Sequence, residues 1–162
     1  MFYTHNIEIY AGKQPTGAYE LKNDAHSVVK RLLRYCSGTG RYVAMDNYFT
    51  SKSLNNDWVH KHRITIVGTL RKNKREVPPI FLDTKLRKRN SSMFACGVDP
   101  NKCVLTSYVR KPNRNVLMLS TFQKDNEIDP ECGDAMKLSA TIFYNLTNEA
   151  VDVVDRMKVA QE

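Results

Sequence analysis

Residues 41–70, RYVAMDNYFTSKSLNNDWVHKHRITIVGTL, contain two short apolar runs separated by a segment of helical character. The first run, 41–45, is typical of a short buried strand, and the second, 64–70, is rich in the β-branched residues that favour strands. Residues 51–62 between them are predicted to form a helix. A strand, a helix and a second strand in this order predict a sheet with helices packed on it, which is an α/β fold.

Asp46 stands directly after the first predicted strand and before the predicted helix. The local pattern leaves two roles open for it. Its carboxylate could cap the helix, but Thr50 and Ser51 are equally able to accept hydrogen bonds from a first helical turn. Ligands collect at the carboxyl ends of strands in sheets of this kind, so Asp46 could instead hold a metal ion.

Further elements are predicted on both sides of this block. The alternation of apolar and polar residues at 6–12 is typical of a strand that leads to a turn. Residues 24–38 have apolar positions at helical spacing, with Asp24 as the expected cap. Two more strands are expected at 103–109 and 115–121, and the chain is predicted to become helical again toward its carboxyl end.

The positive charge of the chain is concentrated in one segment. The sequence has 25 Lys and Arg residues against 17 acids, and residues 58–90 hold ten of these basic residues against two of the acids. A concentrated basic stripe is what binding to a phosphate backbone requires, because each neutralised phosphate releases counterions. A solvated loop or a nuclear-import signal would give the same pattern, so charge alone leaves these alternatives open.

Three acidic residues suit metal-ion chemistry. Asp152 and Asp155 are three residues apart in the predicted terminal helix, so they share one of its faces. Together with Asp46 they would offer the oxygen ligands that Mg²⁺ prefers, and two such ions can stabilise the attacking and leaving oxygens of a phosphodiester. A cap at Asp46 and a solvated helix face at the other two fit the same spacing. The four cysteines and four histidines have no spacing typical of a zinc site.

The block at residues 45–79, MDNYFTSKSLNNDWVHKHRITIVGTLRKNKREVPP, resembles the central block of the piggyBac-type transposase family, in which a strand ends in Asp-Asn-aromatic-Phe-Thr-Ser. The resemblance continues on both sides in IEIYAGK (7–13), SSMFACG (91–97), LTSYVRKP (105–112) and FYNLTNEAVDVVDRM (143–157). It implies an RNase H-like mixed sheet with helices on it, interrupted by a basic insertion domain. The implied divisions are a partial RNase H-like core at 1–70, an insertion subdomain at 71–140, and a returning core helix with the third acidic motif at 141–162.

The same resemblance implies a DNA transposase that cuts and joins DNA with Mg²⁺ or Mn²⁺ held by three aspartates. Asp46 matches the second catalytic aspartate of the family and Asp152 the third, and Asp155 matches an additional acid three positions later. All three are therefore expected metal ligands. The expected DNA-binding residues form one basic cluster after the second strand: Arg71, Lys72, Lys74 and Arg75.

The chain also departs from the family pattern. The first catalytic aspartate of the family lies upstream of its IYxGK motif, and no residue here matches it, so we expect a core that is incomplete at the N-terminus. Glu149 and Ala150 stand where the family usually has two glycines. A metal ion is expected only in a complete site, and the chain alone is expected to be inactive, which leaves its standing as an enzyme open.

The alternative interpretation is a domesticated, non-catalytic DNA-binding module derived from a transposase. In either case the expected partner is DNA at transposon ends, with a homodimer as in other family members, no contact with a membrane, and a nuclear location.

Overall fold

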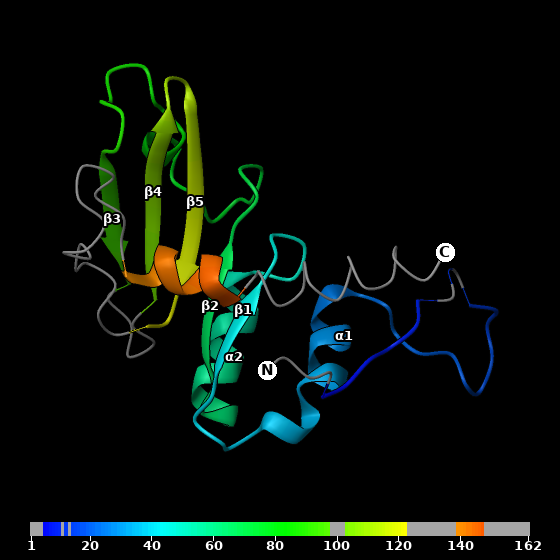
Figure 1. The fold of residues 1–162 in the computed structure, drawn as a ribbon. Helices are drawn as coiled ribbons and strands as arrows, with labels where there is room; N and C mark the ends of the chain where they lie inside the picture. The colour runs from blue at the N-terminus through cyan, green and yellow to red at the C-terminus, as the bar shows by residue number, and fades with distance from the viewer. Residues whose placement is uncertain (1–4, 11, 13, 98–102, 123–138, 148–162) are drawn as a thin grey trace, which may run out of the picture.

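The computed structural model describes residues 5–10, 12, 14–97, 103–122 and 139–147. Five strands within these ranges form one mixed sheet in the order β1-β2-β5-β4-β3, as Figure 1 shows. β1 and β2 are parallel, and the other neighbours are antiparallel. The strands are β1 (Tyr42–Met45), β2 (Thr65–Thr69), β3 (Ser92–Cys96), β4 (Val104–Lys111) and β5 (Arg114–Ser120).

Helices lie on both faces of this sheet. α2 packs on one face of β2, and the helix at 139–147, drawn in orange in Figure 1, lies on the other. No helix among the described residues is long and apolar enough to cross a membrane. The labelled helices are α1 (Ala25–Leu32), η1 (Arg34–Cys36), α2 (Lys52–His62) and η2 (Pro79–Phe81), of which η1 and η2 are single 3₁₀ turns.

α2 confirms the helix predicted between the first two strands. It starts after Ser51, whose Oγ accepts a hydrogen bond of 3.3 Å from the backbone N–H of Leu54. It ends at Arg63, which adopts a left-handed conformation with φ 52°. Leu54 and Trp58 are fully buried and pack with Ile66 of β2, so this helix covers one face of the sheet.

The helix at 139–147 covers the opposite face. Residues of a strand alternate between faces, and Val67 therefore points away from α2. It packs with Met118 of β5 and with Ala140, which is 5% exposed. The ring of Phe143 lies 5.7 Å from that of Tyr42 on β1. The sheet is thus the middle layer of a three-layer arrangement.

The prediction of a strand at residues 6–12 is wrong. No residue that the structure describes there joins a β-ladder. Instead, the Asn6 amide donates to the carbonyl oxygens of Arg31 and Leu32, which lie at the carboxyl end of α1. The Arg31 guanidinium also hydrogen-bonds to the Glu8 carboxylate and lowers its pKa. The alternating segment therefore closes a helix end instead of joining the sheet.

The helix predicted at 24–38 is confirmed in its first part. Asp24 caps it by accepting a hydrogen bond of 3.0 Å from the backbone N–H of Ser27. α1 is shorter than predicted, because the backbone leaves helical geometry after Leu32 and continues as the 3₁₀ turn η1. Gly38 then adopts φ 76°, the left-handed conformation expected of a stop signal.

The later elements follow the prediction in part. The strands expected at 103–109 and 115–121 are confirmed as β4 and β5, whereas β3 is an additional edge strand. The returning helix begins by residue 139, before the point at which the sequence becomes helical in pattern. The strands of the segment at 71–140 share one sheet with β1 and β2, and the division at residues 70 and 140 stays a prediction.

Arg87 fixes the loop before β3 to β4, the strand that pairs with β3. Its Nη1 donates to Ser107 Oγ at 2.7 Å, and its Nη2 donates to the carbonyl oxygens of Ser107 and Ser91 at 2.6 and 3.0 Å. Ser107 Oγ donates in turn to the carbonyl oxygen of Phe81, which also accepts from the Asn115 amide. Burial lowers the pKa of the Arg87 guanidinium, which nevertheless stays charged at neutral pH.

Replacing Arg87 by methionine is expected to lower the free energy of unfolding by about 2 kcal/mol, because two carbonyl oxygens and one hydroxyl lose a charged donor. Urea denaturation measures this loss. Lys88→Met is the matched control, since the neighbouring Lys88 is exposed. Equal losses in the two variants would contradict the assigned role of the Arg87 network.

Candidate functional site

Asp46 lies at the carboxyl end of β1, beside the end of β2. Met45 is the residue opposite Gly68 in the parallel ladder, so Asp46 and Thr69 follow as the next neighbours. Thr69 Oγ1 donates a long hydrogen bond of 3.5 Å to Asp46 Oδ1. The Asp46 side chain is exposed. We call these two residues and the turn that follows β1 the Asp46 edge.

The question of whether Asp46 caps α2 is answered by the hydrogen bonds of the turn. Ser51, not Asp46, supplies the side-chain cap. Asp46 contributes its backbone carbonyl oxygen, which accepts from the N–H groups of Phe49 and Thr50 at 3.1 Å and from Thr50 Oγ1 at 3.0 Å. Its carboxylate is therefore left for another role.

Gly68 allows this turn to pack tightly on β2. A Cβ atom at this position would lie 2.1 Å from Thr50 Oγ1 and 2.8 Å from the carbonyl oxygen of Met45. Both distances are shorter than any ordinary contact. The structure thus explains the Gly-Thr pair of β2. Gly68 leaves room for Thr50, and the hydroxyl of Thr69 reaches the Asp46 carboxylate.

Arg71 is held beside the same turn. Its Nε donates to Asn47 Oδ1 at 2.9 Å, and its guanidinium lies 5.2 Å from the centre of the Tyr48 ring. These contacts order a cation on the turn that follows Asp46. The sequence indicates Arg71 but not its partners Asn47 and Tyr48, because only the three-dimensional turn brings them together.

The other expected DNA-binding residues lie in the turn that follows Arg71. Lys72 and Arg75 are exposed, and Lys74 is half-buried, with its backbone N–H donating to the carbonyl oxygen of Arg71. The cluster therefore directly follows the carboxyl end of β2. Their contact with DNA stays a prediction.

The remaining expected acids, Asp152 and Asp155, lie outside the described residues. Within the described ranges, no three His, Cys, Asp or Glu side chains are grouped so that they could hold a metal ion. Asp46 fits such a site as one exposed carboxylate ligand at a strand end. The helix at 139–147, which precedes these two acids, lies on the face of β2 that contains Val67 and Thr69.

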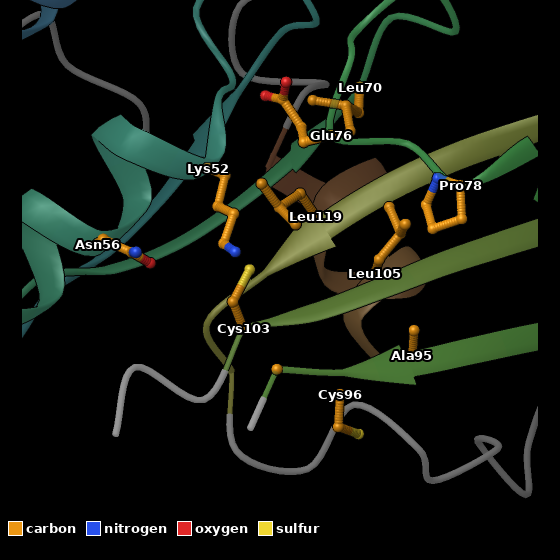
Figure 2. A pocket seen from close by; sticks show the side chains of 11 residues that line it. Lys52, Asn56, Leu70, Glu76, Pro78, Ala95, Cys96, Cys103, Leu105 and Leu119 are labelled. Atoms are coloured by element: carbon orange, nitrogen blue, oxygen red, sulfur yellow. The ribbon is translucent and has the colours of Figure 1, made fainter. Parts of the chain in front are cut away.

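A separate cavity of about 190 Å³ lies on the α2 side of the sheet (Figure 2). Leu70, Leu105 and Leu119 form much of its wall, and Figure 2 shows the Lys52 side chain pointing toward Cys103. Leu119 pairs with Gly68, so it faces away from the Asp46 carboxylate. This cavity lies beside α2, on the other face of the sheet, and is not part of the Asp46 edge.

A comparison with known families places the Asp46 edge in context. A family model described as Transposase IS4 matches residues 1–160. The chain belongs to this family. In this member of the transposase family, the Asp46 edge lies within residues 45–79, the block that resembles piggyBac-type transposases.

One solved structure extends the comparison. The chain is similar to piggyBac transposase in the cryo-EM structure of its synaptic complex with hairpin DNA, with 32% sequence identity and a TM-score of 0.76. The match covers 91% of this chain and 30% of that chain. It confirms the piggyBac-type resemblance, and the mixed sheet agrees with an RNase H-like fold. This member of the transposase family thus spans less than a third of the longer transposase chain.

Proposed function

We propose that this chain is part of a piggyBac-like DNA transposase and that it binds DNA beside the Asp46 edge. The observation that carries the proposal is an exposed carboxylate at a strand end, Asp46, followed by a turn whose next residue, Asn47, holds the cation Arg71 in place. Carboxylates suit divalent metal ions, and an arginine suits the phosphate of a DNA strand. The synaptic complex of the similar piggyBac transposase, which contains hairpin DNA, supports DNA as the partner.

The chemistry of such a transposase is metal-dependent cleavage and strand transfer. Mg²⁺ or Mn²⁺ would be held by Asp46 together with the two acids expected from the resemblance, Asp152 and Asp155. When bound, the ion stabilises the charge that develops on the reacting phosphodiester oxygens. In this arrangement Thr69 orients the Asp46 carboxylate, and Arg71 positions a neighbouring phosphate.

The 162-residue chain alone is proposed to be inactive, because no residue matches the first catalytic aspartate of the family and a site that lacks this ligand is poor at holding two ions. The second candidate function is a domesticated DNA-binding module without catalysis. The excess of basic residues over acids in 58–90 favours it, since binding needs these cations and no carboxylate.

Asp46→Asn is the variant that tests the proposed function. Neither the chain nor the variant is expected to nick supercoiled plasmid with Mg²⁺ or Mn²⁺, and both should bind duplex DNA with equal affinity in a fluorescence anisotropy assay. Arg71→Ala with Lys74→Ala should weaken that binding roughly tenfold, because two cations no longer neutralise phosphates. Nicking by the chain that disappears in Asp46→Asn would show that another carboxylate completes the site. Salt-independent binding would count against both candidates.

We also propose a nuclear location and a homodimer, as the family resemblance suggests. The basic segment at 58–90 could serve nuclear import as well as DNA binding. Light scattering of the purified chain tests the dimer, and a monomer at all concentrations would contradict it.

A further inference from the structure

The hairpin between β4 and β5 carries a second group of cations. Four of them line a hollow of about 420 Å³: Lys72, Arg110, Lys111 and Arg114. Its other lining residues are Asn115 and Val116. We call this feature the hairpin hollow. We propose that the hairpin hollow binds phosphates of the DNA backbone and extends the DNA contact away from the Asp46 edge, an inference that rests on the proposed function.

Charge is the first argument. All four cations are exposed, and no acid is among the residues that line the hollow. No salt bridge joins any of them to a carboxylate within the part of the chain that the structure describes. Like charges gathered around one concave surface repel each other, so a bound anion stabilises the arrangement. A polyanion that crosses the hollow would release counterions from several phosphates at once.

The hollow lies on the same face of the sheet as the Asp46 edge. Arg114, Val116 and Met118 alternate with buried residues along β5 and so share one face. Met118 packs against Val67, which lies on the face of β2 that also contains Thr69. The helix at 139–147 covers Val67 and Met118. Asp46, Val116 and Arg114 stay exposed on the same face, so DNA that passes beside this helix can contact both the hollow and the Asp46 edge.

Distance along the strands is the third argument. Met118 pairs with Thr69, and Arg114 precedes Met118 by four residues, which places it about 13 Å farther along the sheet. Figure 1 shows the β4–β5 hairpin extending beyond the end of β2. Duplex DNA carries one charge per about 1.7 Å of its axis, so this distance spans several phosphates. Lys72 follows Arg71 directly and bridges the two cationic groups along this path.

The strand that carries Arg114 is anchored next to the hollow. Asn115 is 6% exposed, and its amide donates to the carbonyl oxygen of Phe81 at 2.6 Å and to Ser107 Oγ at 2.9 Å. Asn113 in the hairpin turn adopts φ 58°, which an asparagine tolerates well. The cations of the hairpin thus extend from an ordered base, which reduces the entropy lost when they bind.

Lys111→Gln with Arg114→Gln tests the proposal on the full chain. Anisotropy titrations of a fluorescent DNA duplex are made between about 50 and 200 mM salt. The double variant should lose roughly tenfold or more in affinity, and the salt slope of log K should fall by about two, one for each phosphate that is no longer neutralised. Lys22→Gln with Lys30→Gln removes the same charge from two exposed lysines outside both the hollow and the basic segment at 58–90, and should change the affinity much less.

Lys111→Arg with Arg114→Lys keeps the charge and should keep the affinity, which separates charge from folding defects. Equal losses in the hollow variant and in its lysine control would overturn the hairpin hollow while leaving DNA binding intact. Absence of any DNA binding by the unaltered chain would overturn the proposed function and this inference together. Inorganic phosphate is added to the DNA titrations at constant ionic strength to test the other source of phosphate. Displacement of DNA only in chains with an intact hollow would assign a small-anion site instead.

Discussion

Replacing Gly68 by alanine is expected to lower the free energy of unfolding by about 3 kcal/mol, the upper part of the usual range for an overpacked core. The added Cβ would overlap Thr50 Oγ1 and approach the carbonyl oxygen of Met45. Thr50 is fully buried and the carbonyl belongs to β1, so neither can move without displacing the turn that contains Asp46. Chemical denaturation measures the loss, and the circular dichroism of the variant shows whether the sheet is retained.

Gly17→Ala is the matched control for this change. No atom lies within 4 Å of a Cβ built at Gly17, and its φ is outside the left-handed region, so the control should be neutral or slightly stabilising. In the background of Thr50→Ala, the Gly68→Ala change should cost less, because the closest clash is gone while the contact with the Met45 carbonyl remains. Equal costs in both backgrounds would contradict the packing argument.

Trp58→Ala is expected to be the most destabilising side-chain truncation, at about 4 kcal/mol. Trp58 is 1% exposed and packs in the cluster that joins α2 to β1 and β2. Its ring also lies 4.2 Å from that of His62. The change leaves a cavity under α2, which the rigid strands cannot close.

The thermal unfolding midpoint measures this loss, with Tyr19→Ala as the control, because Tyr19 is 94% exposed. The control should unfold at the temperature of the unaltered chain. A small effect of Trp58→Ala would mean that α2 does not depend on the sheet for its stability. The result also bears on function, since a tryptophan buried in the core is not available to stack on a DNA base.

Much of the central block could be predicted because its signals are local. The cap at Ser51 and the β-branched run of β2 act on their own neighbours, so the strand, helix and strand followed from spacing. The prediction for 6–12 is wrong because an alternation of apolar and polar residues gives a strand only where a partner strand is available. β3 gave no clear signal, since it is an edge strand whose five residues are half-buried or exposed.

The candidate site, too, could be predicted only in part. The position of Asp46 could be predicted from its place after a strand, whereas its hydrogen bond from Thr69 depends on the register of two parallel strands. The hairpin hollow could not be predicted from charge along the chain. Arg110 and Arg114 lie outside the basic segment at 58–90. In the rest of the chain the basic residues are balanced by acids, many of which lie at 125–134. Only the folded sheet brings these cations close to Lys72.

The antiparallel pairing of β2 with β5 has a consequence for synthesis. Val67 pairs with Ser120, so the chain must close a loop of about fifty residues before the backbone groups on that side of β2 are hydrogen-bonded to β5. A ribosome adds about 5–20 residues per second, which leaves the β2 edge open for several seconds while the loop and the hairpin are made. During that interval β2 presents unpaired backbone groups to any other strand nearby. We expect chaperone demand and aggregation during translation to be greatest in this window, and to fall once Ser120 has left the ribosome and β5 has docked.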